Sequence, residues 1–240
     1  MRNNLLCMIF CLLAGGSACQ TAGGRLDCGT VERDSTGELY LYYPDFSSLG
    51  LVCGKMPYDD SDVVFCAEAA FTHAIRRKFD HENIDGDHVC DGVLYKGAEC
   101  KDNTGTFAFY GGRWHFAYPA DPALLDSAAA DSCGMCFGQT MLFYRKAFVM
   151  PVRNLMQVTH FRALCELDGR LCIIDSKDTV AFGRFLYLLA SCGVENAIYL
   201  DMGRGWNHSW YREPDGTLRE LFPYSHPYCT NWIVFRRKRD

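Results

Sequence analysis

Short runs of hydrophobic residues, separated by polar turns, follow one another along most of this chain. Several runs alternate apolar and polar positions and are rich in branched and aromatic side chains, which is typical of β-strands. Gly, Pro, Asn and Asp bound the runs, as expected for strands joined by tight turns. The pattern predicts strands over residues 39–43, 49–53, 62–66, 93–97, 105–110, 139–144, 159–166, 170–175, 197–200 and 231–235.

Two of the turns indicate antiparallel hairpins. Gly111 and Gly112 separate two apolar runs, and adjacent glycines supply the positive φ angles that the tightest hairpin turns need. Residues 105–118 are therefore predicted to form a hairpin. Asp168 and Gly169 join two other predicted strands in the same way, so we expect most strand pairs to be antiparallel.

Helical periodicity is confined to two segments. Residues 124–130 predict a short helix, and apolar positions recur at intervals of three and four over residues 179–193, where Gly193 ends the pattern. No internal repeat or low-complexity linker divides the sequence. The sequence therefore predicts an α+β fold, a single domain with a mostly antiparallel or mixed sheet core and few helices.

The first residues have the pattern of a secretory signal peptide. A basic residue precedes an apolar stretch over residues 5–13, and small residues follow, so residues 1–19 are predicted to direct export. The residues before Cys19 resemble a bacterial lipobox, with Gly16 at the position usually held by Leu. We expect Cys19 to become the acylated first residue of the mature chain; cleavage near Ala18 without a lipid is the alternative. The protein is thus expected in the bacterial cell envelope, lipid-anchored or periplasmic, or secreted, and to meet a membrane only through Cys19.

Charge and glycine spacing exclude two classes of ligand. The formal net charge is −5 at pH 7, and an acidic chain is a poor match for the phosphate backbone of nucleic acid. We therefore expect no nucleic-acid partner. The turn Gly203-Arg204-Gly205 lacks the third glycine of a dinucleotide fingerprint and the helix that would follow it, and we expect no cofactor.

Cysteine is frequent, with 14 in the chain. Cys7, Cys11 and Cys19 lie in the export segment, which leaves an odd number, so at least one thiol is expected to be unpaired or to pair outside the chain. Cys133 and Cys136 have the spacing of a redox motif or of half a zinc site. A second pair with such spacing is missing from the sequence. We therefore expect a short-loop disulfide or two thiols there, and no metal site.

Side chains suited to chemistry are concentrated after the predicted strand 197–200, which ends at Asp201. The residues that follow within a glycine-containing turn are Arg204, Trp206, Asn207, His208 and Trp210. Glycine allows a backbone to approach a ligand closely, and a carboxylate, a cation, an imidazole, an amide and two indoles exceed what a turn requires. We therefore expect ligand contact or chemistry at this turn. The alternative is a tight turn before an edge strand whose aromatic side chains only pack.

Four short motifs occur in a characteristic order. Glu68-Ala69-Ala70-Phe71-Thr72 matches an Asn-Ala-Gly-Phe-Phe-like motif, and Gln139-Thr140-Met141-Leu142 matches a Gln-Ser/Thr-Gly-Pro-like strand. His160-Phe161-Arg162-Ala163 then matches His-Pro-Arg-Thr-Ala, and Leu200-Asp201-Met202-Gly203 matches Leu-Asp-Gly-Gly. In these motifs and their order the chain resembles the phosphodiester glycosidase family, of which it would be a divergent bacterial member. The resemblance covers about residues 60–235.

The resemblance implies an enzyme that expels a phosphate-linked group from a sugar. Two carboxylates beside the scissile bond are the common arrangement, and these would be Asp201 and Glu68. Arg162 would clamp the phosphate, because a guanidinium matches it in bidentate geometry, and His160 would transfer protons near neutral pH. The alternatives are a turn-capping Asp201, an exposed or ion-paired Glu68, a buried structural ion pair at Arg162 and a packing role for His160. The substrate-binding residues would be Arg204, Trp206, Asn207, His208 and Trp210.

We therefore expect three segments: the signal peptide at 1–19, a lead-in with the first strands at 20–59, and the glycosidase-like domain at 60–240. The expected function is hydrolysis of a glycosidic bond in a sugar phosphodiester, with a carbohydrate or glycan phosphodiester as substrate. Glu68 at the family's Asn position and Met202 at a Gly position favour a different class, a non-catalytic carbohydrate-binding envelope protein on the same fold. A cell-surface assembly partner is the third possibility.

Overall fold

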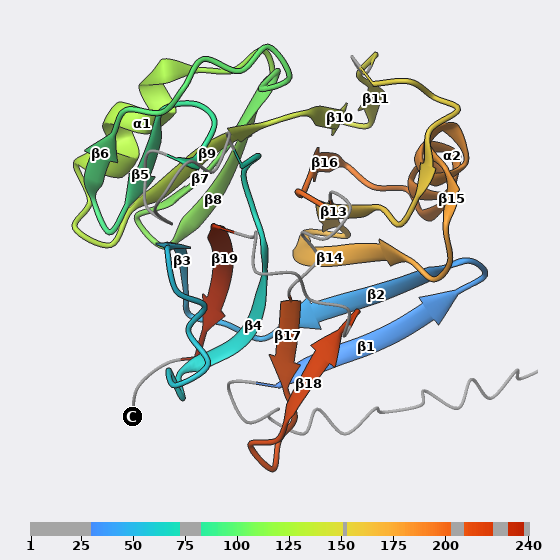
Figure 1. Cartoon of the computed structure of the whole chain (residues 1–240), viewed down its shortest axis with the longest axis horizontal. Helices are drawn as coiled ribbons and strands as arrows, with labels where there is room; N and C mark the ends of the chain where they lie inside the picture. The colour runs from blue at the N-terminus through green and yellow to red at the C-terminus, as the bar shows by residue number, and fades with distance from the viewer. Residues whose placement is uncertain (1–29, 73–82, 151–152, 203–208, 223–229, 238–240) are drawn as a thin grey trace, which may run out of the picture.

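The apolar runs of the sequence form three larger antiparallel sheets and a two-stranded one in the computed structural model, which describes residues 30–72, 83–150, 153–202, 209–222 and 230–237 (Figure 1). The seven-stranded sheet has the spatial order β1 (Val31–Thr36), β2 (Leu39–Pro44), β14 (Arg170–Ser176), β13 (Arg162–Leu167), β16 (Asn196–Tyr199), β10 (Met141–Tyr144) and β11 (Ala147–Phe148). We call it sheet 1. The predicted α+β class with a mostly antiparallel sheet core is confirmed.

Two five-stranded sheets complete the core. Sheet 2 has the order β18 (Leu218–Leu221), β17 (Ser209–Arg212), β4 (Val63–Glu68), β19 (Asn231–Arg236) and β3 (Ser48–Cys53). Sheet 3 has the order β6 (Val93–Tyr95), β5 (His88–Cys90), β9 (Met135–Gln139), β7 (Gly105–Tyr110) and β8 (Arg113–Ala117). The first strands of the chain are integral to these sheets, because β2 pairs with β14 and β3 pairs with β19.

The predicted hairpin is present as β7 and β8, and Gly111 and Gly112 at its turn have φ angles of 57° and 70°. The predicted strand over 139–144 is divided instead. β9 ends at Gln139 in sheet 3, and β10 begins at Met141 in sheet 1. Between them the Thr140 hydroxyl donates to the backbone carbonyl of Asp102 at 2.9 Å. One continuous apolar run therefore supplies strands to two sheets.

The longer helix, α2 (Phe182–Cys192), covers one face of sheet 1 (Figure 1). Its buried residues Phe182, Phe185 and Leu189 pack with side chains such as Ala163 on β13. Gly193 ends the helix with a φ of 81°, a left-handed conformation that favours glycine. Near the start of the helix predicted over 179–193, Val180–Ala181 forms β15 instead, which pairs with β12 (Val158–Thr159).

A shorter helix, α1 (Pro122–Ala129), packs on sheet 3, where its buried Ala128 joins Val89, Ala108 and Cys136. The carboxylate of Asp121 caps its first turn by accepting from the backbone N–H of Ala123 at 2.9 Å. Within the part of the chain that the structure describes, neither helix has the length and apolar character to cross a membrane.

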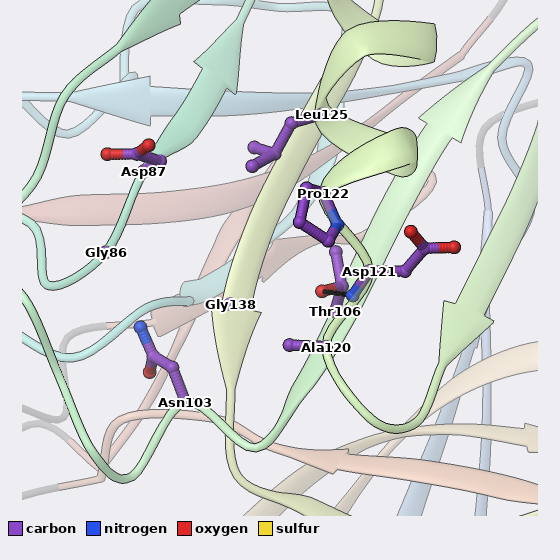
Figure 2. A pocket seen from close by; sticks show the side chains of 9 residues that line it. All are labelled: Gly86, Asp87, Asn103, Thr106, Ala120, Asp121, Pro122, Leu125 and Gly138. Carbon is purple, nitrogen blue, oxygen red and sulfur yellow. Dashed lines mark hydrogen bonds between the residues drawn. The ribbon is translucent and has the colours of Figure 1, made fainter.

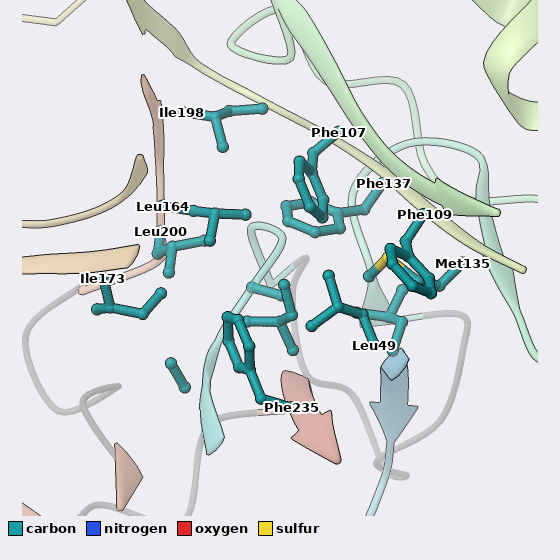
Figure 3. Packing of buried hydrophobic residues seen from close by; sticks show 14 of the residues in the cluster. Leu49, Phe107, Phe109, Met135, Phe137, Leu164, Ile173, Ile198, Leu200 and Phe235 are labelled. Carbon is teal, nitrogen blue, oxygen red and sulfur yellow. The ribbon is translucent and has the colours of Figure 1, made fainter. Parts of the chain in front are cut away.

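The main hydrophobic core lies where the three sheets face one another (Figure 3). Since successive side chains of a strand point to opposite faces, sheet 1 sends one set of residues toward α2 and the other toward sheets 2 and 3. The labelled core residues are Leu49, Phe107, Phe109, Met135, Phe137, Leu164, Ile173, Ile198, Leu200 and Phe235. Arg162 and Asp175 lie at even spacing from Leu164 and Ile173, so they face the same side as this core.

Candidate functional site

A buried ion cluster joins sheet 1 to sheet 2. The guanidinium of Arg162 donates from Nε to Asp175 Oδ1 at 2.6 Å and from Nη2 to Asp175 Oδ2 at 2.7 Å. Its Nη1 donates to Glu68 Oε2 at 2.7 Å and to the Ser209 hydroxyl at 2.6 Å. All four residues are fully buried. This two-pronged pair with Asp175 is the geometry in which guanidinium and carboxylate interact most strongly.

Strand register brings the four residues together. Arg162 begins β13 and is the direct cross-strand partner of Asp175 on β14. Glu68 is the last residue of β4, and Ser209 begins β17, the neighbour of β4 in sheet 2. The cluster therefore connects strand ends from two sheets, and no local sequence pattern links its members.

Burial sets the protonation of the cluster. Two carboxyl groups share one guanidinium. Burial raises the pKa of Glu68 to about 8 because it outweighs the opposing effect of Arg162. The negative charges of Asp175 and Asp201 raise that pKa further. At neutral pH Glu68 therefore carries a proton. Because Oε2 accepts from Arg162, the proton belongs on Oε1, which has no hydrogen-bond partner among the described residues. Burial alone would lower the pKa of Arg162, but Asp175 outweighs it and raises that pKa.

Asp201 lies at the same end of β4. Its exposed fraction is 9%, its backbone N–H donates to the Ala69 carbonyl at 3.2 Å, and its Oδ2 accepts from the backbone N–H of Thr72 at 3.3 Å. The Asn231 side chain holds the same segment by accepting from the Ala70 N–H at 2.8 Å and donating to the Ala70 carbonyl at 3.0 Å. The structure thus brings together the two carboxylates predicted to act in catalysis.

His160 lies beside the cluster but contacts neither carboxylate among the interactions of the described residues. Its ring is 4.8 Å from the ring of Phe222, and its Nδ1 is buried without a hydrogen-bond partner in the described chain. The guanidinium of Arg162 also lies near this ring, 5.7 Å from the centre of the Phe222 side chain. Phe222 has a φ of 57°, a rare conformation for an aromatic residue, and no sequence signal indicates its position between the two.

Arg162 forms a buried ion pair with protein groups. This matches the alternative that the sequence analysis gave to a phosphate-clamping role. Its Nε, Nη1 and Nη2 all donate to protein oxygens, and its side chain has no exposed surface. Direct contact with a substrate phosphate is therefore not available to it in this arrangement. Its main partner is Asp175, which the sequence analysis did not include in the site.

Trp210, predicted to bind substrate, is fully buried on the opposite face of sheet 2 from Ser209. Its ring stacks on Tyr58 at 5.9 Å and packs with Val63, Cys66 and Trp232. The buried indole cannot stack on a sugar in this arrangement. The placement matches the alternative in which Trp210 only packs against other side chains. The other predicted contact residues, and the predicted lipidation site, lie outside the described residues: Arg204, Trp206, Asn207, His208 and Cys19.

A cation that the sequence did not single out lies near Asp201. The guanidinium of half-buried Arg153 lies 4.1 Å from the ring centre of Tyr199 and 5.0 Å from that of Phe71. Burial raises the pKa of Tyr199, on which both Arg153 and Asp201 act electrostatically. The Tyr199 hydroxyl also accepts from the backbone N–H of Met202 at 3.2 Å. Tyr199 therefore connects Arg153 to Asp201 and Met202.

Pockets among the described residues lie elsewhere. One of about 160 Å³ opens between α1 and the loops of sheet 3 (Figure 2). It is lined by Gly86, Asp87, Asn103, Thr106, Ala120, Asp121, Pro122, Leu125 and Gly138. A larger one of about 680 Å³ lies over the β1–β2 hairpin, with Arg33, Tyr42 and Tyr211 in its walls. Neither is lined by the predicted site residues.

Comparison with known proteins shows a fold likeness. No family model matches the chain, and no curated protein matches its sequence. Among solved structures, the catalytic domain of zebrafish N-acetylglucosamine-1-phosphodiester alpha-N-acetylglucosaminidase, auto-inhibited by its pro-peptide, has a TM-score of 0.57 at 12% identity, over 87% of this chain and 82% of that one. A hypothetical protein from Synechocystis has a TM-score of 0.52 at 12% identity, over 86% of this chain and 61% of that one. The chain is thus a distant structural relative of a glycosidase catalytic domain.

Proposed function

We propose that the protein is a hydrolase that cleaves a glycosidic bond, with a sugar phosphodiester as its substrate. The observation that carries the proposal is the pair of carboxyl groups at the end of β4: Glu68, whose pKa is raised to about 8 by burial, and Asp201, whose Oδ2 accepts from the Thr72 N–H. Acid-assisted glycoside cleavage uses two carboxyl groups in different environments, so that one can donate a proton while the other stays ionised. The fold likeness to a glycosidase catalytic domain supports the same reaction class.

In this proposal Glu68 is the general acid. The Glu68 side chain has no exposed surface in this arrangement, so the step requires the groups that cover it to move when substrate binds. Its Oε1 proton then passes to the glycosidic oxygen as the bond from that oxygen to the anomeric carbon breaks, and the phosphate-bearing group leaves with the proton. Asp201, as a carboxylate, stabilises the positive charge that develops on the sugar; water then adds to the anomeric carbon and gives a proton back to Glu68, which restores the acid. Arg162 and Asp175 are positioning residues, because they hold the other oxygen of Glu68 in place.

Arg153 is the cation best placed to meet the substrate phosphate. It is half-buried rather than enclosed, and its guanidinium lies against Tyr199 next to the Asp201 turn. A guanidinium stacked on an aromatic ring retains donors for a phosphate. We therefore assign to Arg153 the clamping role that the sequence suggested for Arg162, and we expect Arg153→Met to raise KM for phosphodiesters more than it lowers kcat.

The test is hydrolysis of a panel of sugar-1-phosphodiesters, beginning with the N-acetylglucosamine-1-phosphodiesters for which the zebrafish enzyme is named. Glu68→Gln and Asp201→Asn are each expected to lower kcat by about 10²-fold or more, while Glu99→Gln, on an exposed residue, serves as the matched control. Thermal unfolding verifies that each variant is folded. Absence of turnover of every substrate by the folded wild-type protein would contradict the proposal.

The full burial of Glu68 favours a second candidate, a carbohydrate-binding protein without catalytic activity. A carboxyl group that substrate never reaches would serve only to join sheets 1 and 2. In that case calorimetry would detect sugar-phosphodiester binding without turnover, and Glu68→Gln would leave the Kd unchanged.

A further inference from the structure

Three potential metal ligands meet where sheet 2 contacts sheet 3. Cys53 is the last residue of β3, and His88 and Cys90 lie on β5, a strand that packs against β3 (Figure 1). One ligand atom from each of the three lies within 4.8 Å of the others. The Sγ atoms of Cys53 and Cys90 are 4.0 Å apart. None of the three belongs to the Glu68–Arg162 cluster.

The backbone fixes each ligand in place. His88 and Cys90 are two residues apart on a strand, so their side chains project from the same face. Cys53 is held by its cross-strand pairing with Asn231, and the next residue, Gly54, donates its N–H to the Thr230 carbonyl at 2.9 Å. Both β5 ligands are buried, and Cys53 is half-buried. The convergence is therefore a property of the folded sheets rather than of flexible surface side chains.

The His88 ring is oriented as zinc-binding histidines usually are. Its Nδ1 lies 3.0 Å from the backbone carbonyl oxygen of Gly86, and the ring stacks on Tyr95 with the ring centres 5.6 Å apart. Metal-bound histidines generally donate one ring N–H to a carbonyl or carboxylate, which fixes the tautomer and presents the other nitrogen to the metal.

We propose that Cys53, His88 and Cys90 bind a structural zinc ion that ties sheet 2 to sheet 3. Two thiolates and an imidazole are ligands that zinc prefers, and water would take the fourth tetrahedral position. Two sulfur atoms on one tetrahedral zinc lie about 3.8 Å apart, given Zn–S bonds of about 2.3 Å. The observed 4.0 Å fits that spacing, whereas a disulfide requires about 2.05 Å.

Metal binding also accounts for two cysteine side chains that face each other, one buried and one half-buried. Zinc binds cysteine as the thiolate, so it displaces the thiol protons when it binds. The Cys133–Cys136 pair offers no comparable site, because Cys133 is exposed and Cys136 is buried against α1.

The experiment measures metal in the full-length protein, purified under reducing conditions without chelator and then dialysed against zinc-free buffer. We expect one zinc ion per chain by mass spectrometry of the metal, retained in the control variant Cys133→Ser. Cys90→Ser and His88→Gln are each expected to retain less than about a tenth of it. Replacing zinc by cobalt should give the near-ultraviolet thiolate-to-cobalt absorption in the wild-type protein and weaken it in Cys53→Ser.

Chelator treatment of the wild-type protein provides a second measurement that does not depend on whether the variants fold. If free zinc is present at about a hundred times its Kd, removing it with a chelator should lower the Tm by about 5–10 °C. Added zinc should restore the Tm. Two results would overturn the proposal. One is a wild-type protein that binds neither zinc nor cobalt stoichiometrically. The other is a Cys53–Cys90 disulfide, seen by peptide mass mapping in protein that never held metal.

Discussion

Replacing Glu68 by Gln should change how stability depends on pH. Glutamine has nearly the same shape as a protonated glutamic acid, and its amide oxygen can accept the hydrogen bond that Arg162 Nη1 donates to Oε2. The wild-type side chain holds a proton up to about pH 8 in the folded protein but only up to about pH 4.5 when unfolded. The variant has no such group, so a comparison of the two isolates this one titration.

The sign follows from proton linkage. Between the two pKa values the folded protein binds a proton that the unfolded chain does not, so the free energy of unfolding falls as pH rises. The stabilisation is fully present below the unfolded pKa and is lost as pH passes through the folded pKa of about 8. The slope is about 1.4 kcal/mol per pH unit, which gives about 4–5 kcal/mol over the whole window. The free energy of unfolding of Glu68→Gln, relative to that of the wild-type protein, should therefore rise steadily as pH increases toward 8.

Urea unfolding at constant ionic strength, at several pH values between about 5 and 8, measures this difference. Contributions from all other groups cancel when the free energy of unfolding of Glu68→Gln is subtracted from that of the wild-type protein. Glu99→Gln, on an exposed carboxylate, should leave the pH dependence unchanged. If the difference between wild-type and Glu68→Gln stays constant across the pH range, Glu68 is ionised in the folded protein and the argument for a general acid fails.

Three further outcomes are expected. Arg162→Met leaves two buried carboxyl groups without their cation and should lower the free energy of unfolding by about 3–5 kcal/mol, measured in urea at neutral pH. Trp210→Ala should cost about 3–5 kcal/mol through the cavity it leaves, yet leave the affinity for sugar phosphodiesters unchanged in calorimetry; a large loss of affinity in the folded variant would contradict its packing role. We also propose that Cys19 is acylated: the wild-type protein made in a bacterial host should carry labelled fatty acid and Cys19→Ser should not, and absence of label from the wild-type protein would contradict this proposal.

Local pattern was sufficient for much of the fold. The Gly111–Gly112 hairpin and the helix end at Gly193 follow from conformations that glycine adopts easily. The run over 139–144 could not be divided from sequence, because an apolar run looks the same whether its residues serve one sheet or two. The change of sheet depends on what Thr140 meets, and its partner, the Asp102 carbonyl, is distant in sequence.

The site was predictable only in part, for a related reason. The sequence indicated Glu68, Arg162 and Asp201 through motif order, and these three interact in the structure. Asp175 and Arg153 carried no such signal, because their importance depends on register and on tertiary packing: Asp175 matters only as the cross-strand partner of Arg162, and Arg153 only where its chain passes Tyr199.

The residue at position 68 shows how one side chain can alter the chemistry of a buried cluster without altering a fold. An asparagine there, as the resembled motif has, would accept the hydrogen bond from Arg162 and leave Arg162 and Asp175 as a neutral pair. Glutamate adds a charge that burial does not tolerate, so the site takes up a proton instead, and the cluster stays neutral at pH 7. The packing between sheets is therefore preserved, while the protein gains an acidic proton beside Asp201. An activity that uses this proton must fall as pH rises above about 8, whereas a binding role that uses only the packing would not.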